Sequence, residues 1–343
     1  IGVEKILSVS IAAYNVEKTL REALESFTNK KICNYLDVMI IDDGSKDSTA
    51  KIAKEYVKKY PNTFRLISKI NGGWGSTLNV GMQEAKGKYF KQLDGDDYYS
   101  HENLEAFIQF LLKTDADMIQ SPFVTFSDNK GEILHEYGTY DGNYSLFPLG
   151  ETVLLQDCDN YIPAMHSITV KTEILKTNDI NITEHCFYTD VEFVLKAFNF
   201  CKTISFFERP VYYYRLARNG QSMSQAGVRK NYRDHQKMLL TMLKYYKENV
   251  TKSYVKKVFE NRLDGVCNMQ YIFYFALECT SKQKKELIEF DTFLKKEYPD
   301  FYYRVLGRQV NFLRKTKFWG YWLVARQKMY KDKKLKRNIF EGC

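Results

Sequence analysis

The N-terminal third of the chain alternates short apolar runs with longer amphipathic runs, and this alternation constrains the fold more than any other feature. The apolar runs cover residues 7–14, 36–43, 64–69 and 88–94. The runs between them place apolar side chains at helical spacing, as Leu20, Leu24 and Phe27 do. Strands that alternate with helices in this way predict a parallel sheet covered by helices.

The remainder of the chain changes character twice. From about Ala116 the pattern is mixed, with apolar segments that predict a hairpin and with a helical run at 188–200. After Gln225 the pattern is helical throughout and increasingly basic. We therefore expect an α/β domain over residues 1–224 and a helical C-terminal region over residues 225–343.

The composition is that of a globular protein with reduced thiols. The chain has 343 residues, 44% of them hydrophobic, which is enough to bury a sizeable core. Its 7 cysteines form no CxxC pair, as is typical of reduced thiols rather than of a disulfide framework or a metal site. No apolar run reaches the roughly 18 residues of a membrane span, and no signal peptide opens the sequence. We therefore expect a cytoplasmic protein.

Positive charge is concentrated at the end of the chain. The net charge is +9, yet residues 301–343 alone hold 12 Lys and Arg against two acids. Four aromatic residues are interleaved with them: Phe318, Trp319, Tyr321 and Trp322. This mixture suits an anionic membrane surface, such as the inner face of the cell membrane. A solvated helical face packed on the body is the other interpretation, and nucleic acid is the least favoured partner.

Polar residues follow three of the predicted strands, at the point where each strand ends. The three segments are Tyr14–Asn15, Asp42–Ser45 and Asp94–Asp97. Ligands of such sheets bind at the carboxyl ends of the strands, so we expect these groups at one edge of the sheet. Asp94, Asp96 and Asp97 repel one another at neutral pH unless a cation lies among them. An ordinary polar turn is the simpler interpretation of the last segment taken alone.

Five motifs, in this order, resemble those of the family 2 glycosyltransferases: SVSIAAYN, VMIIDDGSKDST, NGGWGSTLN, GKYFKQLDGDDYY and YTDVEF. The resemblance covers residues 7 to about 224, and each motif falls at a predicted strand or helix end. It implies a GT-A fold, which is a Rossmann-like mixed sheet flanked by helices. It also implies an inverting enzyme that uses a nucleotide-diphosphate sugar and a divalent cation, Mg²⁺ or Mn²⁺.

The resemblance assigns the metal to the DGDD segment. It implies that Asp96 binds the cation directly and that Asp94 lies near both the ribose and the metal. Carboxylate oxygens suit hard cations, which bridge the pyrophosphate and offset the charge on the leaving UDP. We expect Gly95 to keep the backbone close to the ligand. For Asp97 we expect a supporting or a capping role.

The pocket for the base is expected at the first two strand ends. Tyr14 can stack its ring on a pyrimidine, and Ala13 leaves room for that ring. Either Asp42 or Asp43 can accept a hydrogen bond from uracil N3–H, a donor that cytosine lacks. The donor predicted by this pattern is therefore a UDP-sugar. In the alternative interpretation, Tyr14 and Asn15 only turn the chain into the following helix.

Several residues are predicted to contact the diphosphate. They are Lys69, Asn71, Gly72, Gly73, Arg218, Gln221 and Ser222. The glycines would supply backbone amides, and the last three residues fall in a segment that resembles a loop closing over the diphosphate in several relatives. Many relatives carry an Arg where this chain has Leu78, so a cationic contact has to come from elsewhere. Lys69 and Arg218 are the two candidates, although an ordinary polar loop also fits the segment of Arg218.

Inverting transfer needs one carboxylate to take the proton from the acceptor hydroxyl. The family places this base in a short acidic motif at a helix start, and that motif falls on Asp190. Relatives often carry Glu-Asp there, whereas this chain has Thr189 before Asp190, which puts the details of acceptor binding in doubt. A helix-capping acid is the alternative role of Asp190. His185 lies close by in sequence, although a lone histidine is more often structural.

The sequence therefore predicts an enzyme that moves a single sugar from a UDP-sugar to a hydroxyl of a glycan or lipid-linked acceptor in surface polysaccharide synthesis. The QxxRW motif and the membrane spans of processive synthases are missing, which favours single transfer. Two alternatives stay open: a polyprenyl-phosphate glycosyltransferase, and a non-catalytic UDP-binding scaffold of the same fold. The departures at Leu78 and Thr189 favour the scaffold. An oligomer formed through the C-terminal helices also stays open.

Overall fold

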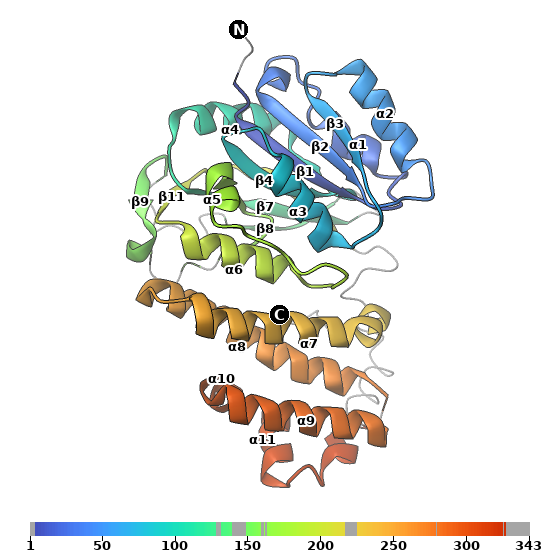
Figure 1. Cartoon of the computed structure of the whole chain (residues 1–343), viewed down its shortest axis with the longest axis vertical. Helices are drawn as coiled ribbons and strands as arrows, with labels where there is room; N and C mark the ends of the chain where they lie inside the picture. The colour runs from blue at the N-terminus through green and yellow to red at the C-terminus, as the bar shows by residue number, and fades with distance from the viewer. Residues whose placement is uncertain are drawn as a thin grey trace. The chain divides into compact units, whose positions relative to one another are not determined.

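The computed structural model describes residues 4–127, 132–138, 149–158, 161, 163–216, 225–278, 280–324 and 326. The chain divides into two compact units, Ile1–Arg218 and Asn219–Cys343, and each is described by itself (Figure 1). The boundary predicted between residues 224 and 225 falls a few positions later in the chain than this division. Residues 217–224 lie outside the described part, and with them Arg218, Gln221 and Ser222 of the predicted loop.

A sheet of eight strands forms the centre of the N-terminal unit. In spatial order these are β3 (Phe64–Ser68), β2 (Leu36–Asp42), β1 (Leu7–Ala13), β4 (Tyr89–Asp94), β10 (Ile168–Lys171), β6 (Met118–Gln120), β11 (Thr203–Phe206) and β9 (Thr152–Leu154). The first four are parallel to one another, whereas β10 runs antiparallel to both β4 and β6. This confirms the predicted α/β class with a mixed sheet, and the four predicted strands agree with β1 to β4 to within one residue.

A second sheet contains the strand that follows β4 in the chain. Its strands, in spatial order, are β5 (Tyr98–Tyr99), β12 (Tyr212–Leu216), β7 (Phe123–Ser127) and β8 (Ile133–Tyr137). The antiparallel pairing of β7 with β8 confirms the predicted hairpin. Because β12 pairs with β5, a segment more than a hundred positions later is brought beside the DGDD turn.

Helices cover both faces of the main sheet. They are α1 (Leu20–Glu25), α2 (Thr49–Lys59), α3 (Trp74–Glu84), α4 (His101–Lys113), α5 (Thr172–Thr177) and α6 (Asp190–Phe200). Helices α1, α2 and α4 bury their apolar sides in one core with β1, β2 and β4. Helices α3, α5 and α6 follow one another on the other face (Figure 1). β1 and β2 are buried almost throughout, as expected of central parallel strands.

A buried lysine ties β4 to the segment before β10. The Lys91 side chain is fully enclosed, and its ammonium donates to the carbonyl oxygens of His166 (2.9 Å) and Ile168 (3.0 Å). Burial lowers the pKa of Lys91 to about 7. The His166 ring stacks on Phe123 and Tyr214, and burial, with the charge of Lys91, lowers its pKa to about 3. His166 is therefore neutral at physiological pH and packs as an aromatic residue.

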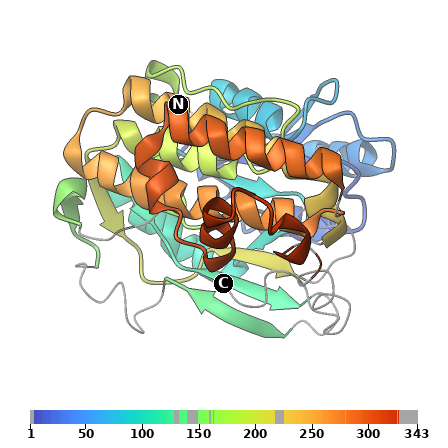
Figure 2. The same cartoon turned by 90° about the horizontal axis from the view of Figure 1, so that it is seen from below.

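The C-terminal unit is helical, as the sequence predicts. Its helices are α7 (Gln225–Asn249), α8 (Ser253–Ala276), α9 (Ser281–Glu297), α10 (Pro299–Arg304) and α11 (Arg308–Lys315), coloured from yellow to red in Figure 2. Within the described residues, no helix has both the length and the apolarity that a bilayer crossing requires.

One buried ion pair joins the last three helices of this unit to α8. The Asp291 carboxylate of α9 accepts hydrogen bonds from the Tyr271 hydroxyl (2.6 Å) and from Arg314 Nε (2.9 Å). The Arg314 guanidinium also lies 3.6 Å from the centroid of the Tyr302 ring. The segment around residues 301–324 is therefore an integral part of the fold, rather than an appended basic tail.

A matched pair of helical glycines tests the packing of α3 on β1. A Cβ atom at Gly81 of α3 would lie 2.0 Å from Ser10 Oγ, whereas a Cβ at Gly265 of α8 would meet no atom within 4 Å. We expect Gly81→Ala to lower the free energy of unfolding by about 1–3 kcal/mol through overpacking. Gly265→Ala should raise it by up to about 1 kcal/mol, because alanine favours the helix. Calorimetric unfolding of both variants checks this, and equal shifts would contradict the tight packing.

Candidate functional site

The DGDD turn holds its carboxylates in a small volume at the end of β4. One ligand oxygen from each of Asp94, Asp96 and Asp97 lies within 4.8 Å of the others. The turn is tied to β1 by a hydrogen bond from Gly95 N to the Ala12 carbonyl (2.9 Å). A Cβ at Gly95 would lie 2.8 Å from that carbonyl oxygen, so only glycine allows the turn to approach β1 this closely.

Asp97 connects this turn to the second sheet. Its buried carboxylate accepts hydrogen bonds from the Tyr212 hydroxyl (2.6 Å) and from Arg215 N (2.8 Å), both on β12. Burial, followed by the charges of the neighbouring carboxylates, raises its pKa well above the ordinary value. The cap of α4 is instead Ser100, whose hydroxyl accepts from Asn103 N (3.1 Å). Of the two roles expected for Asp97, capping the next helix is therefore wrong.

Asp94 is held by a residue that the sequence analysis did not single out. The Trp74 indole N–H, at the start of α3, donates to Asp94 Oδ1 (2.7 Å). The other Asp94 oxygen has no partner within the described part of the chain. Burial, the charge of Asp96 and, more weakly, that of Asp190 raise the pKa of Asp94 to about 7, and the Trp74 hydrogen bond opposes this rise.

Asp190 therefore lies close enough to Asp94 for their charges to interact. The side chain of Tyr214 on β12 lies near the same acids. After burial, the charges of Asp97, Asp94, Asp96 and Asp190 all raise its pKa. The structure thus brings the first residue of α6 to the DGDD turn, although more than ninety residues separate them in the chain.

This donor set fits a divalent cation. Carboxylates that raise one another's pKa are stabilised in the charged form when a cation lies among them. One Asp94 oxygen has no hydrogen-bond partner among the described residues, and all the ligands offered are oxygens, the type preferred by Mg²⁺ and Mn²⁺. Asp97 is occupied by Tyr212 and Arg215, which leaves Asp94 and Asp96 as the residues that would hold the ion.

The two acids after β2 have different surroundings. The Asp43 carboxylate accepts hydrogen bonds from Gly72 N (2.9 Å), Gly73 N (2.9 Å) and Lys69 Nζ (2.7 Å). The Lys69 ammonium also donates to the Ile70 carbonyl and to a serine hydroxyl, each at 2.6 Å. These glycine amides and Lys69, predicted to face the diphosphate, are thus engaged by Asp43 in this structure. Asp43 fixes the loop that leads into α3.

The Asp42 carboxylate makes fewer hydrogen bonds than that of Asp43. Its Oδ1 accepts from Ser45 N (3.0 Å), and its second oxygen has no partner in the described residues. Tyr14, whose side chain is 49% exposed, follows the buried Ala13 at the end of β1. Asn15 adopts a left-handed φ of 53°, and its side-chain oxygen accepts from a backbone amide (2.8 Å). Together these residues form a partly open edge suited to a planar base.

The start of α3 also positions the segment that leads to Asp190. The Asn79 side chain pairs with Ile182, accepting from its N (2.8 Å) and donating to its O (2.9 Å). His185 N donates to the Gly72 carbonyl (2.6 Å), and a Cβ at Gly75 would lie 2.3 Å from the Thr183 carbonyl oxygen. The segment before Asp190 is therefore held by α3, the same helix that holds Asp94 through its first residue.

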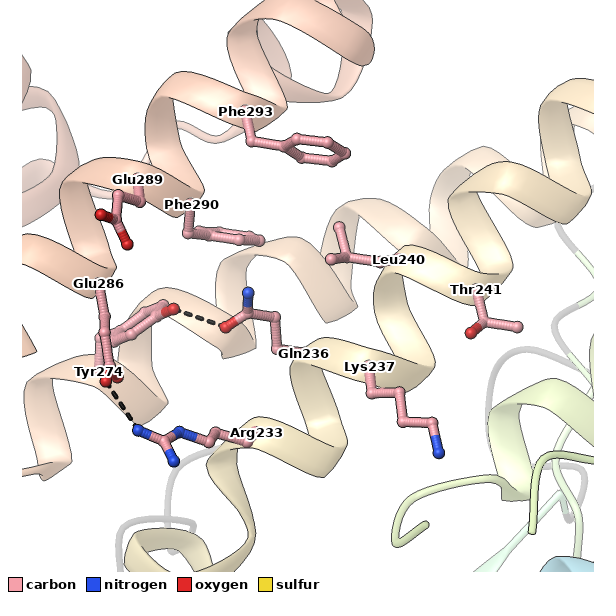
Figure 3. A pocket seen from close by; sticks show the side chains of 10 residues that line it. All are labelled: Arg233, Gln236, Lys237, Leu240, Thr241, Tyr274, Glu286, Glu289, Phe290 and Phe293. Atoms are coloured by element: carbon pink, nitrogen blue, oxygen red, sulfur yellow. Dashed lines mark hydrogen bonds and ion pairs between the residues drawn. The ribbon is translucent and has the colours of Figure 1, made fainter. Parts of the chain in front are cut away.

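A pocket of about 720 Å³ is formed by residues of the C-terminal unit (Figure 3). It is lined by Arg233, Gln236, Lys237, Leu240, Thr241, Tyr274, Glu286, Glu289, Phe290 and Phe293. Four of its polar side chains pair with one another. Arg233 forms an ion pair with Glu286 (2.7 Å), and the Tyr274 hydroxyl donates to Gln236 Oε1 (2.6 Å). This arrangement is that of a helical groove stabilised by internal pairs.

Residues 8–174 match the model of the family described as Glycosyl transferase family 2. This part of the chain belongs to glycosyltransferase family 2. The chain is 28% identical over 256 residues to the minor teichoic acid biosynthesis protein GgaB of Bacillus subtilis (strain 168), covering 71% of this chain and 27% of that protein. It is 33% identical over 207 residues to an uncharacterized glycosyltransferase of Rickettsia prowazekii (strain Madrid E), covering 56% of this chain and 63% of that relative. It therefore spans less than two thirds of the length of these curated relatives.

The likeness of fold to solved structures extends beyond the matched segment. The structure of the S. aureus TarS fragment 1–349 in complex with UDP superposes with a TM-score of 0.65, covering 98% of this chain and 95% of that one. At 21% sequence identity, this likeness concerns the fold alone. It confirms the predicted GT-A fold with its C-terminal helical region.

Replacing Trp74 tests how Asp94 is held. The hydrogen bond from the Trp74 N–H lowers the pKa of Asp94. Trp74→Phe keeps an aromatic ring but removes this donor. We therefore expect this pKa to rise above about 7 in the variant. The measurement is a carbon-13 carboxyl titration without divalent cations, with the Asp94 signal assigned from Asp94→Asn. Trp319→Phe, at a side chain 85% exposed in the C-terminal unit, is the matched control. Superimposable titrations of Asp94 in all three proteins would show that the hydrogen bond is unimportant.

Proposed function

We propose that the N-terminal unit transfers one sugar from a UDP-sugar to an acceptor hydroxyl, with inversion at the anomeric carbon. The observation that carries this proposal is the meeting of Asp94 and Asp96 with Asp190, which comes from a different element. Besides burial, the charges of Asp96 and Asp190 raise the pKa of Asp94. A diphosphate held at Asp94 and Asp96 would therefore bring its sugar within reach of a base at Asp190.

The donor contacts we propose come from the strand ends. The Tyr14 ring would stack on the uracil, and the spare Asp42 oxygen would accept from uracil N3–H. Asp94 and Asp96 would hold Mg²⁺ or Mn²⁺, which when bound supplies charge stabilisation to the departing UDP. The UDP bound to TarS, a protein of similar fold, supports this choice of nucleotide.

Asp190 is the base in this proposal. As the first residue of α6, it lies at the positive end of the helix dipole, which favours its carboxylate form. It accepts the proton of the acceptor hydroxyl as that oxygen attacks the anomeric carbon. The bond to the diphosphate breaks as the new glycosidic bond forms, and attack from the opposite side inverts the centre.

For the acceptor we propose a cell-surface glycan or its lipid-linked precursor. The name of GgaB, a minor teichoic acid biosynthesis protein, supports this class. A polyprenyl phosphate is the alternative acceptor, and it is already ionised, so it would not need Asp190. A scaffold that binds UDP without turnover is the other alternative. The two alternatives therefore differ from the main proposal in measurable ways.

UDP release from a panel of UDP-sugars, with and without Mn²⁺, tests the reaction. We expect metal-dependent release from one sugar, with Asp96→Asn and Asp190→Asn each lowering kcat by about a hundredfold or more. Asp115→Asn, at a side chain 80% exposed in the same unit, is the control and should keep full activity. Activity that survives in Asp190→Asn would favour the lipid-phosphate acceptor. UDP binding without any turnover would instead identify the scaffold.

We further propose that the protein works at the inner face of the cell membrane through its C-terminal unit. Trp319 (85% exposed), Leu306 (73%) and Leu323 (70%) present large apolar side chains to solvent. They alternate in the chain with basic residues such as Lys315 and Lys317. Exposed aromatic and apolar groups mixed with cations suit an anionic bilayer surface.

Vesicle sedimentation tests this surface. Deletion of residues 301–343 would remove the buried Arg314 and unfold the unit, so point substitutions are the sharper tool. We expect Trp319→Ser with Leu323→Ser to weaken partitioning onto phosphatidylglycerol vesicles by about tenfold, since each loses a membrane-inserted apolar group. Ile70→Ser, at a side chain 90% exposed in the N-terminal unit, is the control. Equal partitioning of all three proteins would rule out the membrane proposal.

A further inference from the structure

Two buried polar side chains next to the candidate site have no hydrogen-bond partner in the part of the chain that the structure describes. Gln92 is 2% exposed, and neither its amide nitrogen nor its amide oxygen is paired. Thr189 is 1% exposed, and its hydroxyl is unpaired as well. Although Thr189 occupies the N-cap position of α6, its side chain does not cap the helix. Buried polar groups are nearly always satisfied, so two unpaired ones in one region call for an explanation.

Strand alternation and one aromatic contact place the two side chains in the same region, between β4 and the first turn of α6. Alternation along β4 puts Phe90, Gln92 and Asp94 on one face of the sheet. Phe90 packs edge-on against Phe193 of α6, with ring centroids 6.3 Å apart. Two residues further along the strand, Gln92 therefore lies under the residues that precede Phe193 by one turn.

The other end of this region is fixed by the carboxylates. The charge of Asp190 acts on Asp94, so the N-terminus of α6 lies over the end of β4. Thr189 is the residue directly before Asp190. Gln92 and Thr189 are thus enclosed between the Phe90–Phe193 contact on one side and the Asp94 and Asp190 carboxylates on the other.

A transferred sugar would occupy the space between these same carboxylates. If the proposed function holds, the diphosphate lies at Asp94 and Asp96, and Asp190 faces the hydroxyl that attacks the anomeric carbon. The sugar ring is bonded to the diphosphate, and the hydroxyl beside Asp190 attacks it. Gln92 offers two donors and an acceptor, and Thr189 offers one of each, which matches the hydroxyl or acylamino groups of a sugar.

We propose that Gln92 and Thr189 form a subsite that hydrogen-bonds the polar substituents of the transferred sugar. This inference rests on the proposed function and deepens it, because it assigns residues to the choice of sugar. In the free protein the unpaired groups cost stability, and pairing with the sugar recovers that cost as affinity. Both side chains can turn toward a ligand by rotating their own torsions.

Near-isosteric substitutions separate this role from a structural one. Gln92→Met and Thr189→Val keep the side-chain volume and remove the unpaired groups. We expect both variants to bind UDP within about twofold of the wild type, whereas kcat/KM for the UDP-sugar falls by about tenfold or more. Their thermal midpoints should rise by about 2 °C, because an unsatisfied buried group is lost.

Thr169→Val is the matched control. Thr169 on β10 also has a fully buried hydroxyl with no partner among the described residues. Its neighbour Val170 pairs with Phe90, so Thr169 points to the face opposite that of Gln92. This variant should gain stability in the same way and keep its kcat/KM.

The outcomes of this experiment are distinct. Loss of kcat/KM in Gln92→Met and Thr189→Val, with UDP affinity retained, supports the subsite. If both variants keep the wild-type kcat/KM for the UDP-sugar while the wild type binds UDP and turns over, the subsite is refuted and the proposed function stands. If the wild type neither binds UDP nor releases it from any UDP-sugar, the proposed function fails and this inference fails with it.

Discussion

The hydrogen bonds of Asp97 to Tyr212 and Arg215 are the interaction on which the N-terminal site depends. They join the turn after β4 to β12, the strand that lies beside β5 in the second sheet. Through this junction Tyr214 is buried, and it is brought among four acids whose charges add to the effect of burial in raising its pKa. Clustering like charges costs free energy, and the fold offsets that cost with donors aimed at individual oxygens. Trp74 acts in this way on Asp94, as Tyr212 and Arg215 do on Asp97.

Each strand end pairs one acid that holds the scaffold with one that remains available. After β2, Asp43 is saturated by Lys69 and two glycine amides, whereas one Asp42 oxygen is unpaired within the described residues. After β4, Asp97 is committed to β12, whereas one Asp94 oxygen has no partner among the residues that the structure describes. A rigid acid beside an available one fixes the backbone where the ligand binds. That arrangement limits the movement needed when a charged donor arrives.

The sequence allowed the strands of the parallel half to be predicted because each is a continuous apolar run ended by polar residues. β1 to β4 needed only that local pattern, and their ends then had to share one edge of the sheet. The choice between Asp42 and Asp43 could not be made in the same way, because it depends on amides of residues 72 and 73 that approach from a different loop. The role of Trp74 was equally hidden, since nothing in NGGWGSTLN shows that its indole meets a carboxylate twenty positions later. The hydrogen bonds between β12 and Asp97 depend on strand pairing across more than a hundred residues, which no local pattern contains.

The departure at Leu78 acquires a physical meaning from its surroundings. Leu78 is buried in α3, so the position where many relatives carry an arginine has become part of the packing. Lys69 is tied to Asp43, and Arg215 donates to the Asp96 carbonyl (2.8 Å) and pairs with Glu22, so neither cation is available without breaking those bonds. If a diphosphate binds here as proposed, neither of these two cations is ready to offset its negative charge, and a divalent cation at Asp94 and Asp96 would take a larger share of that role. A site of this kind depends on its metal more strongly than one with a built-in arginine, because the same carboxylates that attract the cation would repel the diphosphate in its absence.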